Sequence, residues 1–151
     1  MRIFKVICLV AVLAAGMSVT AQTKDAAAPH VDVISIDGSI NPAVDDFIRE
    51  SIGRAKANGA KALIIQLDTP GGLLNSTRTI VKEMLGAEVP VMVYVSPSGA
   101  GAGSAGVFIT MAAHIAAMAP GTHIGAAHPV AGGGQEVKGV MGEKIENFTA
   151  S

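Results

Sequence analysis

The chain has 151 residues and a net charge of −1, and it is 50% hydrophobic but only 3% aromatic. The near-neutral charge, without any basic run, argues against nucleic acid as a partner, and the scarcity of aromatic side chains removes the platforms on which bases stack. We therefore expect no nucleic-acid partner. The length suits one domain around one core.

The first 21 residues have the features of a secretory signal peptide. Arg2 and Lys5 precede a short apolar run, and small residues lead to Ala21, where we expect cleavage. The run is about 10 residues long, well short of the roughly 20 that a spanning helix needs. The single cysteine, Cys8, lies in this segment, so the mature chain would contain no disulfide and no thiolate nucleophile. We expect an exported protein at the periplasmic or extracytoplasmic face of the cell membrane.

Residues 22–30 are polar and are expected to form a linker, and residues 31–151 are expected to form one domain. A helix is predicted to begin near residue 140, and the chain stops inside it. We therefore expect the domain to be truncated at its C-terminus.

The predicted elements alternate between strand and helix. Residues 31–38 alternate as a strand does, and Asn41 before Pro42 then predicts a helix start. Apolar residues at three- and four-residue steps continue this helix to about residue 58. Residues 62–68 are almost continuously apolar, which is typical of a parallel strand covered on both faces.

The same pattern continues along the chain. Helical spacing recurs over residues 74–86, and residues 89–95 form a second buried strand. Residues 104–114 are apolar on all sides, which predicts a buried helix. Residues 114–126 indicate a short strand and a turn. This alternation favours an α/β fold with a mostly parallel sheet.

Two glycine-rich turns follow the carboxyl ends of predicted strands, where open α/β folds place their sites. The second turn, residues 101–106, matches the GxGxxG pattern of dinucleotide-binding proteins. The match follows the third predicted strand instead of the first, and no acidic residue stands about 20 positions later to bind a ribose. A nucleotide site is therefore disfavoured.

A nucleophilic serine at the start of a buried helix accounts for the same residues. Ser104 has the small neighbours Gly103 and Ala105, and a helix N-terminus offers N–H groups to a developing oxyanion. The site is not the GxSxG elbow of α/β-hydrolases, because Ala102 replaces its first glycine. Serine is also a common helix N-cap, and spacing alone does not distinguish the two roles.

The first glycine-rich turn, at residues 68–72, is the second candidate part of the site. Gly71 and Gly72 can adopt a conformation that exposes adjacent N–H groups, as an oxyanion hole requires. Pro-Gly-Gly is also ordinary turn chemistry, so this signal is weak by itself.

Four stretches together resemble the membrane-bound ClpP-class serine proteases, the NfeD family, which are related to signal peptide peptidase A. In the family's order, they are LDTPGG (67–72), PVMVYVSPSGAGAGSAGVFI (90–109), HIAAMAPGTHIGAAHPV (114–130) and EKIENF (143–148). The resemblance implies a ClpP/crotonase-like fold of repeated β-β-α units with a mostly parallel sheet. We expect no cofactor.

The resemblance further implies a Ser-Lys dyad. Ser104 falls on the family's nucleophile and Lys144 on its general base. Gly71 and Gly72, with the N–H of Ala105, would form the oxyanion hole. A lysine acts as a base only where burial or nearby positive charge lowers its pKa. Without the resemblance, a solvated helix lysine would be the preferred interpretation.

Other bases and ligands remain as alternatives. Lys138 lies in a glycine-flanked loop and is the main competing base. A Ser-His-Asp arrangement with His123 or His128 and Asp68 is a second mechanism, because ClpP uses a histidine base, but the order fits no clear triad. The two histidines lack a third ligand, so we expect no metal. We expect Asp68 to order the Pro-Gly-Gly turn.

The expected function is a serine endopeptidase that cleaves hydrophobic peptide segments of membrane-associated proteins. The resemblance implies a stomatin-like membrane partner and a self-associated enzyme. An acyl-CoA enzyme of the crotonase type is an alternative, which the export signal disfavours. A non-catalytic module that binds or assembles a membrane partner is the alternative from a different class.

Overall fold

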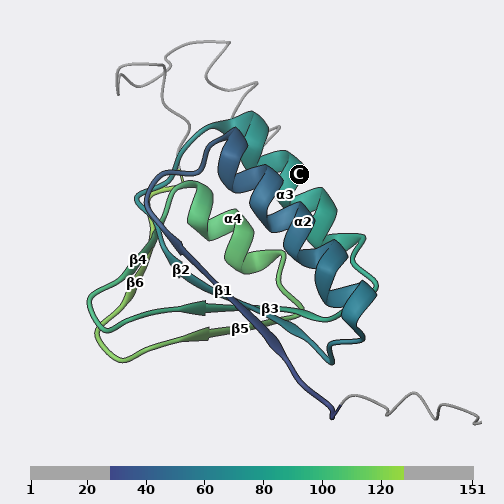
Figure 1. Cartoon of the computed structure of the whole chain (residues 1–151). Coiled ribbons are helices and arrows are strands. Elements are labelled where there is room, and N and C mark those ends of the chain that lie inside the picture. The colour runs from purple at the N-terminus through teal and green to yellow at the C-terminus, as the bar shows by residue number, and fades with distance from the viewer. Residues whose placement is uncertain (1–27, 128–151) are drawn as a thin grey trace, which may run out of the picture.

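The computed structural model describes residues 28–127 (Figure 1). The predicted signal peptide, and the C-terminal segment that contains Lys138, Lys144 and His128, lie outside the described residues.

A four-stranded parallel sheet of order β1-β2-β3-β5 forms the centre of the structure. Its strands are β1 (Asp32–Asp37), β2 (Leu63–Asp68), β3 (Val91–Val95) and β5 (Ile115–Met118). A second, two-stranded parallel sheet joins β4 (Gly101–Gly103) to β6 (His123–Gly125). The α/β fold with a parallel sheet, predicted from the sequence, is confirmed.

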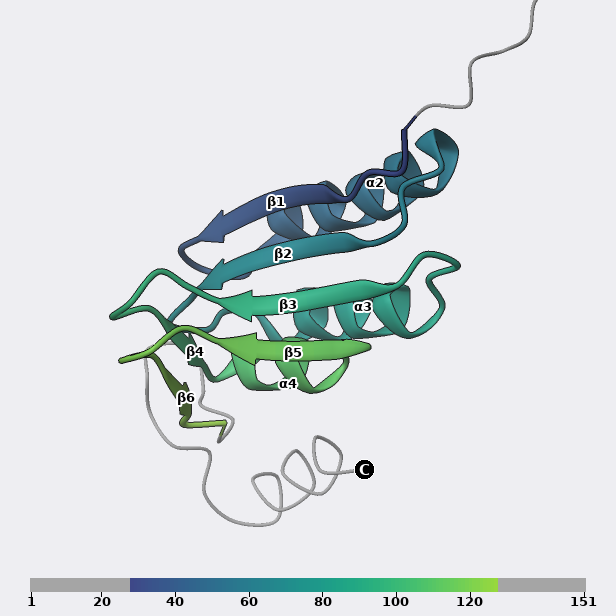
Figure 2. The same cartoon turned by 90° about the horizontal axis from the view of Figure 1, so that it is seen from below.

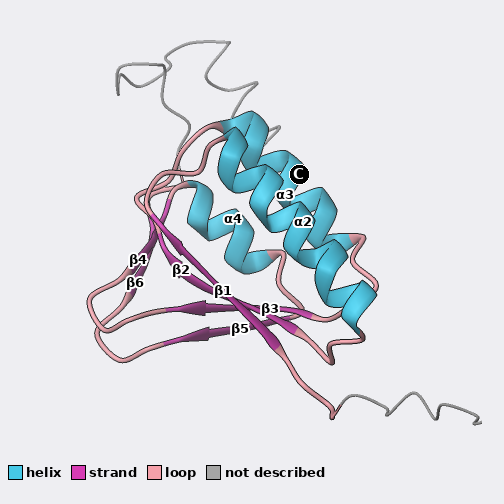
Figure 3. Cartoon of the chain, viewed as in Figure 1, coloured by secondary structure: helices cyan, strands magenta, loops and turns pink. Residues whose placement is uncertain are grey.

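Within residues 28–127, the helices form one layer over one face of the sheet (Figures 2 and 3). They are α2 (Pro42–Asn58), α3 (Leu74–Leu85) and α4 (Ala105–Met111). Each helix lies in the connection between two parallel neighbours of the sheet. The turns at the carboxyl ends of the strands therefore lead into helix N-termini.

Local signals fix both ends of α2. The Asn41 Oδ1 accepts hydrogen bonds from the N–H groups of Ala43 (2.9 Å) and Val44 (3.2 Å). At the other end, Gly59 has a φ of 71°, a left-handed conformation that ends helices. The helix predicted from Asn41, Pro42 and the apolar spacing is confirmed.

The core lies between the sheet and the helix layer. Alternate residues of β2 and β3 are buried there: Leu63, Ile65, Leu67, Val91, Val93 and Val95. Their neighbours Ile64, Gln66, Met92 and Tyr94 are only half-buried. The prediction that these strands are covered on both faces is therefore wrong, because the described helices cover one face alone.

The uncovered face carries an apolar row across all four strands of the sheet. The parallel register aligns Val33 with Ile64, Ile64 with Met92, and Met92 with Ile115. In-register residues of parallel strands point to the same face. The two edge residues of the row, Val33 and Ile115, are 54% and 53% exposed.

Helix α4 is only partly buried. Ile109 is fully buried against the sheet, whereas Met111 is 76% exposed. The prediction of a helix buried all round is wrong, because the side of α4 away from the sheet lines an open groove with α3.

Candidate active site

Two loops meet at the carboxyl end of β2. The Thr69 N–H donates to the Gly101 carbonyl (2.7 Å), and the Thr69 carbonyl accepts from the Gly103 N–H (2.8 Å). The Asp68 carboxylate accepts from the Gly101 N–H at 2.9 Å. The Pro-Gly-Gly turn and the loop before Ser104 are therefore joined over two consecutive residues. The prediction that Asp68 orders the Pro-Gly-Gly turn is wrong, since its hydrogen bond goes to the other loop.

Ser104 has a strained backbone and does not cap its helix. Its φ of 47° and ψ of −107° are unusual for a residue with a side chain, and its side chain makes no capping hydrogen bond to α4. The Ser104 N–H donates to the Gly125 carbonyl at 2.9 Å, which holds the residue in place. The helix-cap interpretation, which the sequence left open, is excluded. Strain of this kind concentrates at functional sites.

Gly71 lies directly against Ser104. A Cβ atom built on Gly71 would be 2.6 Å from the Ser104 Cβ and 3.1 Å from its Oγ. Gly71 also has a φ of 121°, which side-chain-bearing residues rarely adopt. Glycine is therefore required here both by the backbone and by the nucleophile candidate beside it.

The three predicted oxyanion-hole residues differ in how their N–H groups are used. The Gly71 N–H donates to the Thr69 hydroxyl at 3.1 Å. Ala105 is the first residue of α4, where N–H groups lack intrahelical acceptors. Within residues 28–127, the N–H groups of Gly72 and Ala105 have no hydrogen-bond acceptor. Gly72 directly follows Gly71, and Ala105 directly follows Ser104. Their two N–H groups are available to a ligand.

The glycines of the GxGxxG match are explained by packing. A Cβ on Gly101 would be 2.5 Å from the His123 Nε2, and one on Gly103 would be 2.9 Å from the Pro70 carbonyl oxygen. A Cβ on Gly106 would be 2.7 Å from the Thr69 Cγ2. Each glycine thus lets two segments approach closely, so the match needs no nucleotide.

The alternative catalytic and metal-binding residues are not brought together. The His123 ring packs over Gly101, and Asp68 bonds the N–H of the same glycine. Among the described residues, neither side chain is hydrogen-bonded to the other or to Ser104. In this same part of the chain, no three metal-ligating side chains form a cluster.

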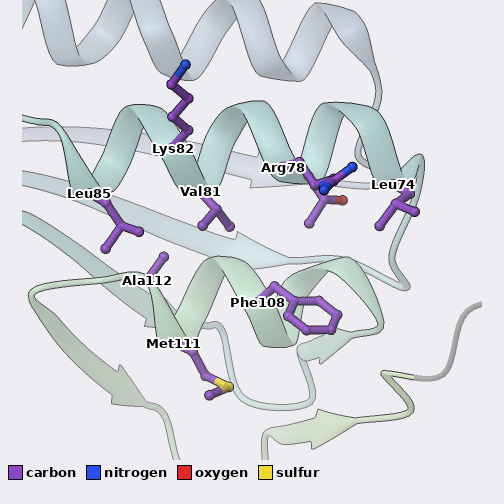
Figure 4. Close-up of a pocket in the computed structure, with 9 residues that line it drawn as sticks. Leu74, Arg78, Val81, Lys82, Leu85, Phe108, Met111 and Ala112 are labelled. Carbon is purple, nitrogen blue, oxygen red and sulfur yellow. The ribbon is translucent and has the colours of Figure 1, made fainter. Parts of the chain in front are cut away.

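An apolar groove runs between α3 and α4, with a volume of about 530 Å³ (Figure 4). It is lined by Leu74, Thr77, Arg78, Val81, Lys82, Leu85, Phe108, Met111 and Ala112. Phe108 lies one helical turn after Ser104, and Leu74 lies two residues after Gly72, so the groove begins near both loops. The groove could have been expected from the sequence, because Leu74, Val81 and Leu85 are seven and four residues apart and so lie on one face of a helix.

The described helices contain no segment that is both long and apolar enough to cross a membrane.

Residues 30–147 match the family NfeD1b, N-terminal domain. The chain belongs to this family. The resemblance to the NfeD family seen in the sequence is thereby confirmed.

This NfeD1b-type domain is 43% identical over 102 residues to membrane-bound protease PH1510 of Pyrococcus horikoshii. It is 34% identical over 104 residues to membrane protein NfeD1b of Bacillus subtilis. The matches cover 68% and 69% of this chain but 23% of each relative, so the chain spans about a quarter of their length.

Solved structures with the same fold include 1510-N, described as a membrane-bound stomatin-specific protease. A lysine-to-alanine mutant in complex with a substrate peptide has a TM-score of 0.74 and 38% identity, over 82% of this chain and 57% of that chain. A serine-to-alanine mutant has a TM-score of 0.73 and 37% identity, over 82% and 60%. ClpP1 of Listeria monocytogenes, at 18% identity and a TM-score of 0.64 over 78% and 66%, shares the fold. The predicted ClpP-like fold is confirmed.

Proposed function

We propose that this NfeD1b-type domain is the catalytic domain of a serine endopeptidase in which Ser104 is the nucleophile. The observation that carries the proposal is the conformation of Ser104: its backbone is strained, and its side chain makes no capping hydrogen bond to α4. Gly71 packs against its side chain and leaves no bulky group between the hydroxyl and the turn. A serine that served only the helix would need neither feature.

The oxyanion hole in this proposal lies between the two loops. The N–H groups of Gly72 and Ala105 donate to the carbonyl oxygen of the substrate as it becomes negatively charged. Gly71 contributes the close approach to Ser104, while its own N–H is bonded to Thr69.

Lys144 is the proposed general base. In the two 1510-N mutants, a serine and a lysine are replaced by alanine, and the lysine mutant holds a substrate peptide. By their numbers, those two residues are 41 positions apart. Ser104 and Lys144 are 40 positions apart, whereas Ser104 and Lys138 are 34 apart. This spacing favours Lys144 over Lys138.

The reaction proceeds in two stages. Neutral Lys144 removes the proton from the Ser104 hydroxyl as its oxygen attacks the peptide carbonyl carbon. The C–N bond then breaks, and the Lys144 ammonium returns the proton to the leaving amine. The resulting acyl-serine ester is attacked by a water molecule that loses one proton to Lys144. The ester C–O bond then breaks, the Lys144 ammonium returns that proton to the Ser104 oxygen, and the acid product leaves.

The proposed substrate is an extended apolar peptide segment of a membrane-associated protein. A relative is described as specific for a stomatin homologue, which makes a stomatin-like protein the leading candidate partner. The relatives are membrane proteins, and the predicted signal peptide would direct this one to the extracytoplasmic face. Such a peptide would add as a strand beside the Gly71-Gly72 turn.

Fluorophosphonate labelling of the full-length protein tests the proposal. The native protein should be labelled, Ser104→Ala should lose labelling completely, and Lys144→Ala should lose most of it. Lys138→Ala is the matched control and should retain the native rate. Labelling that survives in Ser104→Ala would overturn the nucleophile, and labelling lost only in Lys138→Ala would move the base.

Self-association, which the family resemblance implies, is a separate proposal. Light scattering coupled to size-exclusion chromatography of the detergent-solubilised full-length protein measures it directly. A mass equal to one chain at micromolar concentration would contradict it.

A further inference from the structure

Thr69 lies at the junction of the two loops. It directly follows β2 and is only 2% exposed. Its backbone is bonded on both sides to the loop that leads to Ser104, through Gly101 and Gly103. Its side chain, in contrast, points to the Pro-Gly-Gly turn.

The Thr69 hydroxyl bonds both polar backbone groups of Gly71. It accepts a hydrogen bond from the Gly71 N–H at 3.1 Å and donates one to the Gly71 carbonyl at 3.2 Å. One hydroxyl can do both, because it has one donor and two acceptor lone pairs. The Gly71 carbonyl also accepts from the Ile40 N–H at 2.8 Å. Two donors therefore fix the direction of this carbonyl.

The direction of the Gly71 carbonyl determines that of the Gly72 N–H. The two groups belong to the same planar peptide unit, which is trans, so they point in opposite directions. With its carbonyl held by Thr69 and Ile40, the peptide turns the Gly72 N–H away from them. That N–H has no acceptor within residues 28–127.

We propose that the Thr69 hydroxyl is a positioning group that holds the Gly72 N–H in the orientation an oxyanion hole requires. This inference rests on the proposed function, since it concerns the same site. Thr69 contacts no reacting atom and acts through the Gly71–Gly72 peptide.

The two halves of the Thr69 side chain have separate roles, which makes the inference testable. Its hydroxyl contacts Gly71, while its Cγ2 methyl faces Gly106 in the first turn of α4. Thr69→Val keeps a methyl against Gly106 and removes the hydroxyl. Thr69→Ser keeps the hydroxyl and removes the methyl.

The kinetic test uses the full-length protein and a fluorogenic apolar peptide. Thr69→Val should lower both kcat and the rate of fluorophosphonate labelling by at least about tenfold. The loss should be smaller than the roughly 10²–10³-fold fall in kcat that follows deletion of an oxyanion-hole donor, because the Gly72 N–H is still present. Thr69→Ser should stay within about threefold of native. KM should change little in either variant, because the Gly72 N–H acts mainly in the transition state. The peptide should bind with equal affinity to the single variant Ser104→Ala and to the double variant Ser104→Ala/Thr69→Val, because the Thr69 hydroxyl is not expected to affect substrate binding.

Hydrogen exchange measured by mass spectrometry on peptides that span residues 69–73 gives a readout independent of activity. Thr69→Val should speed exchange of the Gly71 amide by about tenfold, since that amide loses its acceptor, and Thr69→Ser should not. Native labelling and native exchange in Thr69→Val would overturn this inference alone. A native protein that is never labelled would overturn the proposed function, whatever the exchange data show.

Discussion

Gly71 packs so closely against the side chain of Ser104 that there is no room for a methyl group on the Gly71 Cα. A Cβ on Gly71 would lie 2.6 Å from the Ser104 Cβ. The Pro-Gly-Gly turn and the helix that follows Ser104 are therefore fitted to each other at the atoms proposed to react.

Gly71→Ala should abolish fluorophosphonate labelling and destabilise the domain by about 1–3 kcal/mol. The added methyl would collide with Ser104, and alanine is strained at a φ of 121°. Denaturant unfolding and labelling rate measure the two effects. Gly53→Ala, in α2 where nothing lies within 4 Å of an added Cβ, should instead stabilise by about 0.5–1 kcal/mol. Native labelling by Gly71→Ala would contradict the close contact between Gly71 and Ser104.

Ser104→Gly should be more stable than Ser104→Ala by about 1 kcal/mol. Both variants remove the hydroxyl, but only glycine relaxes at a φ of 47°. At an ordinary helix start, the free energies of unfolding of the glycine and alanine variants would differ only through capping preference. At position 104 the alanine variant is also destabilised by backbone strain. Equilibrium unfolding in urea measures the difference. An alanine variant at least as stable as the glycine variant would contradict the strain.

Gly101→Ala should destabilise the domain by about 1–3 kcal/mol through contact with His123. The added Cβ would lie 2.5 Å from the His123 Nε2, at the far end of a side chain that can be removed. The double variant Gly101→Ala/His123→Ala should therefore recover most of the loss. A double-mutant cycle measures this coupling. Additive effects would instead indicate that Gly101 is required by its own backbone.

Ile109→Ala should cost about 2–5 kcal/mol, and Met111→Ala less than about 0.5 kcal/mol. Both residues belong to α4, but Ile109 is fully buried and Met111 is 76% exposed. Thermal unfolding of the two variants compares them directly. Similar losses would mean that the outer face of α4 is covered in solution.

Elements with local signals could be predicted from the sequence. Asn41, Pro42 and Gly59 set the bounds of α2 through capping and turn chemistry, which depend on neighbouring residues alone. In contrast, the sequence of β4 predicts a turn. Its glycines and alanine have little preference for strands, and its pairing depends on Thr69 and on β6, far along the chain.

The parts of the candidate site could be predicted, but their geometry could not. Ser104, Gly71 and Gly72 stood out as small residues after strands. The conformation of Ser104 is imposed by the Gly125 carbonyl and the contact with Gly71, neither of which is adjacent in the sequence. The role of Thr69 was hidden for the same reason, although a threonine two residues before a glycine is a known turn signal.

The uncovered face of the sheet has a practical consequence for handling the domain. Within residues 28–127, its apolar row runs from edge to edge, and its two exposed ends, Val33 and Ile115, lie on the edge strands of the sheet. Surfaces of this kind promote aggregation. The substitutions Val33→Lys and Ile115→Lys, at the two exposed ends of this row, should raise the solubility of a purified domain and leave the opposite, helix-covered side unchanged.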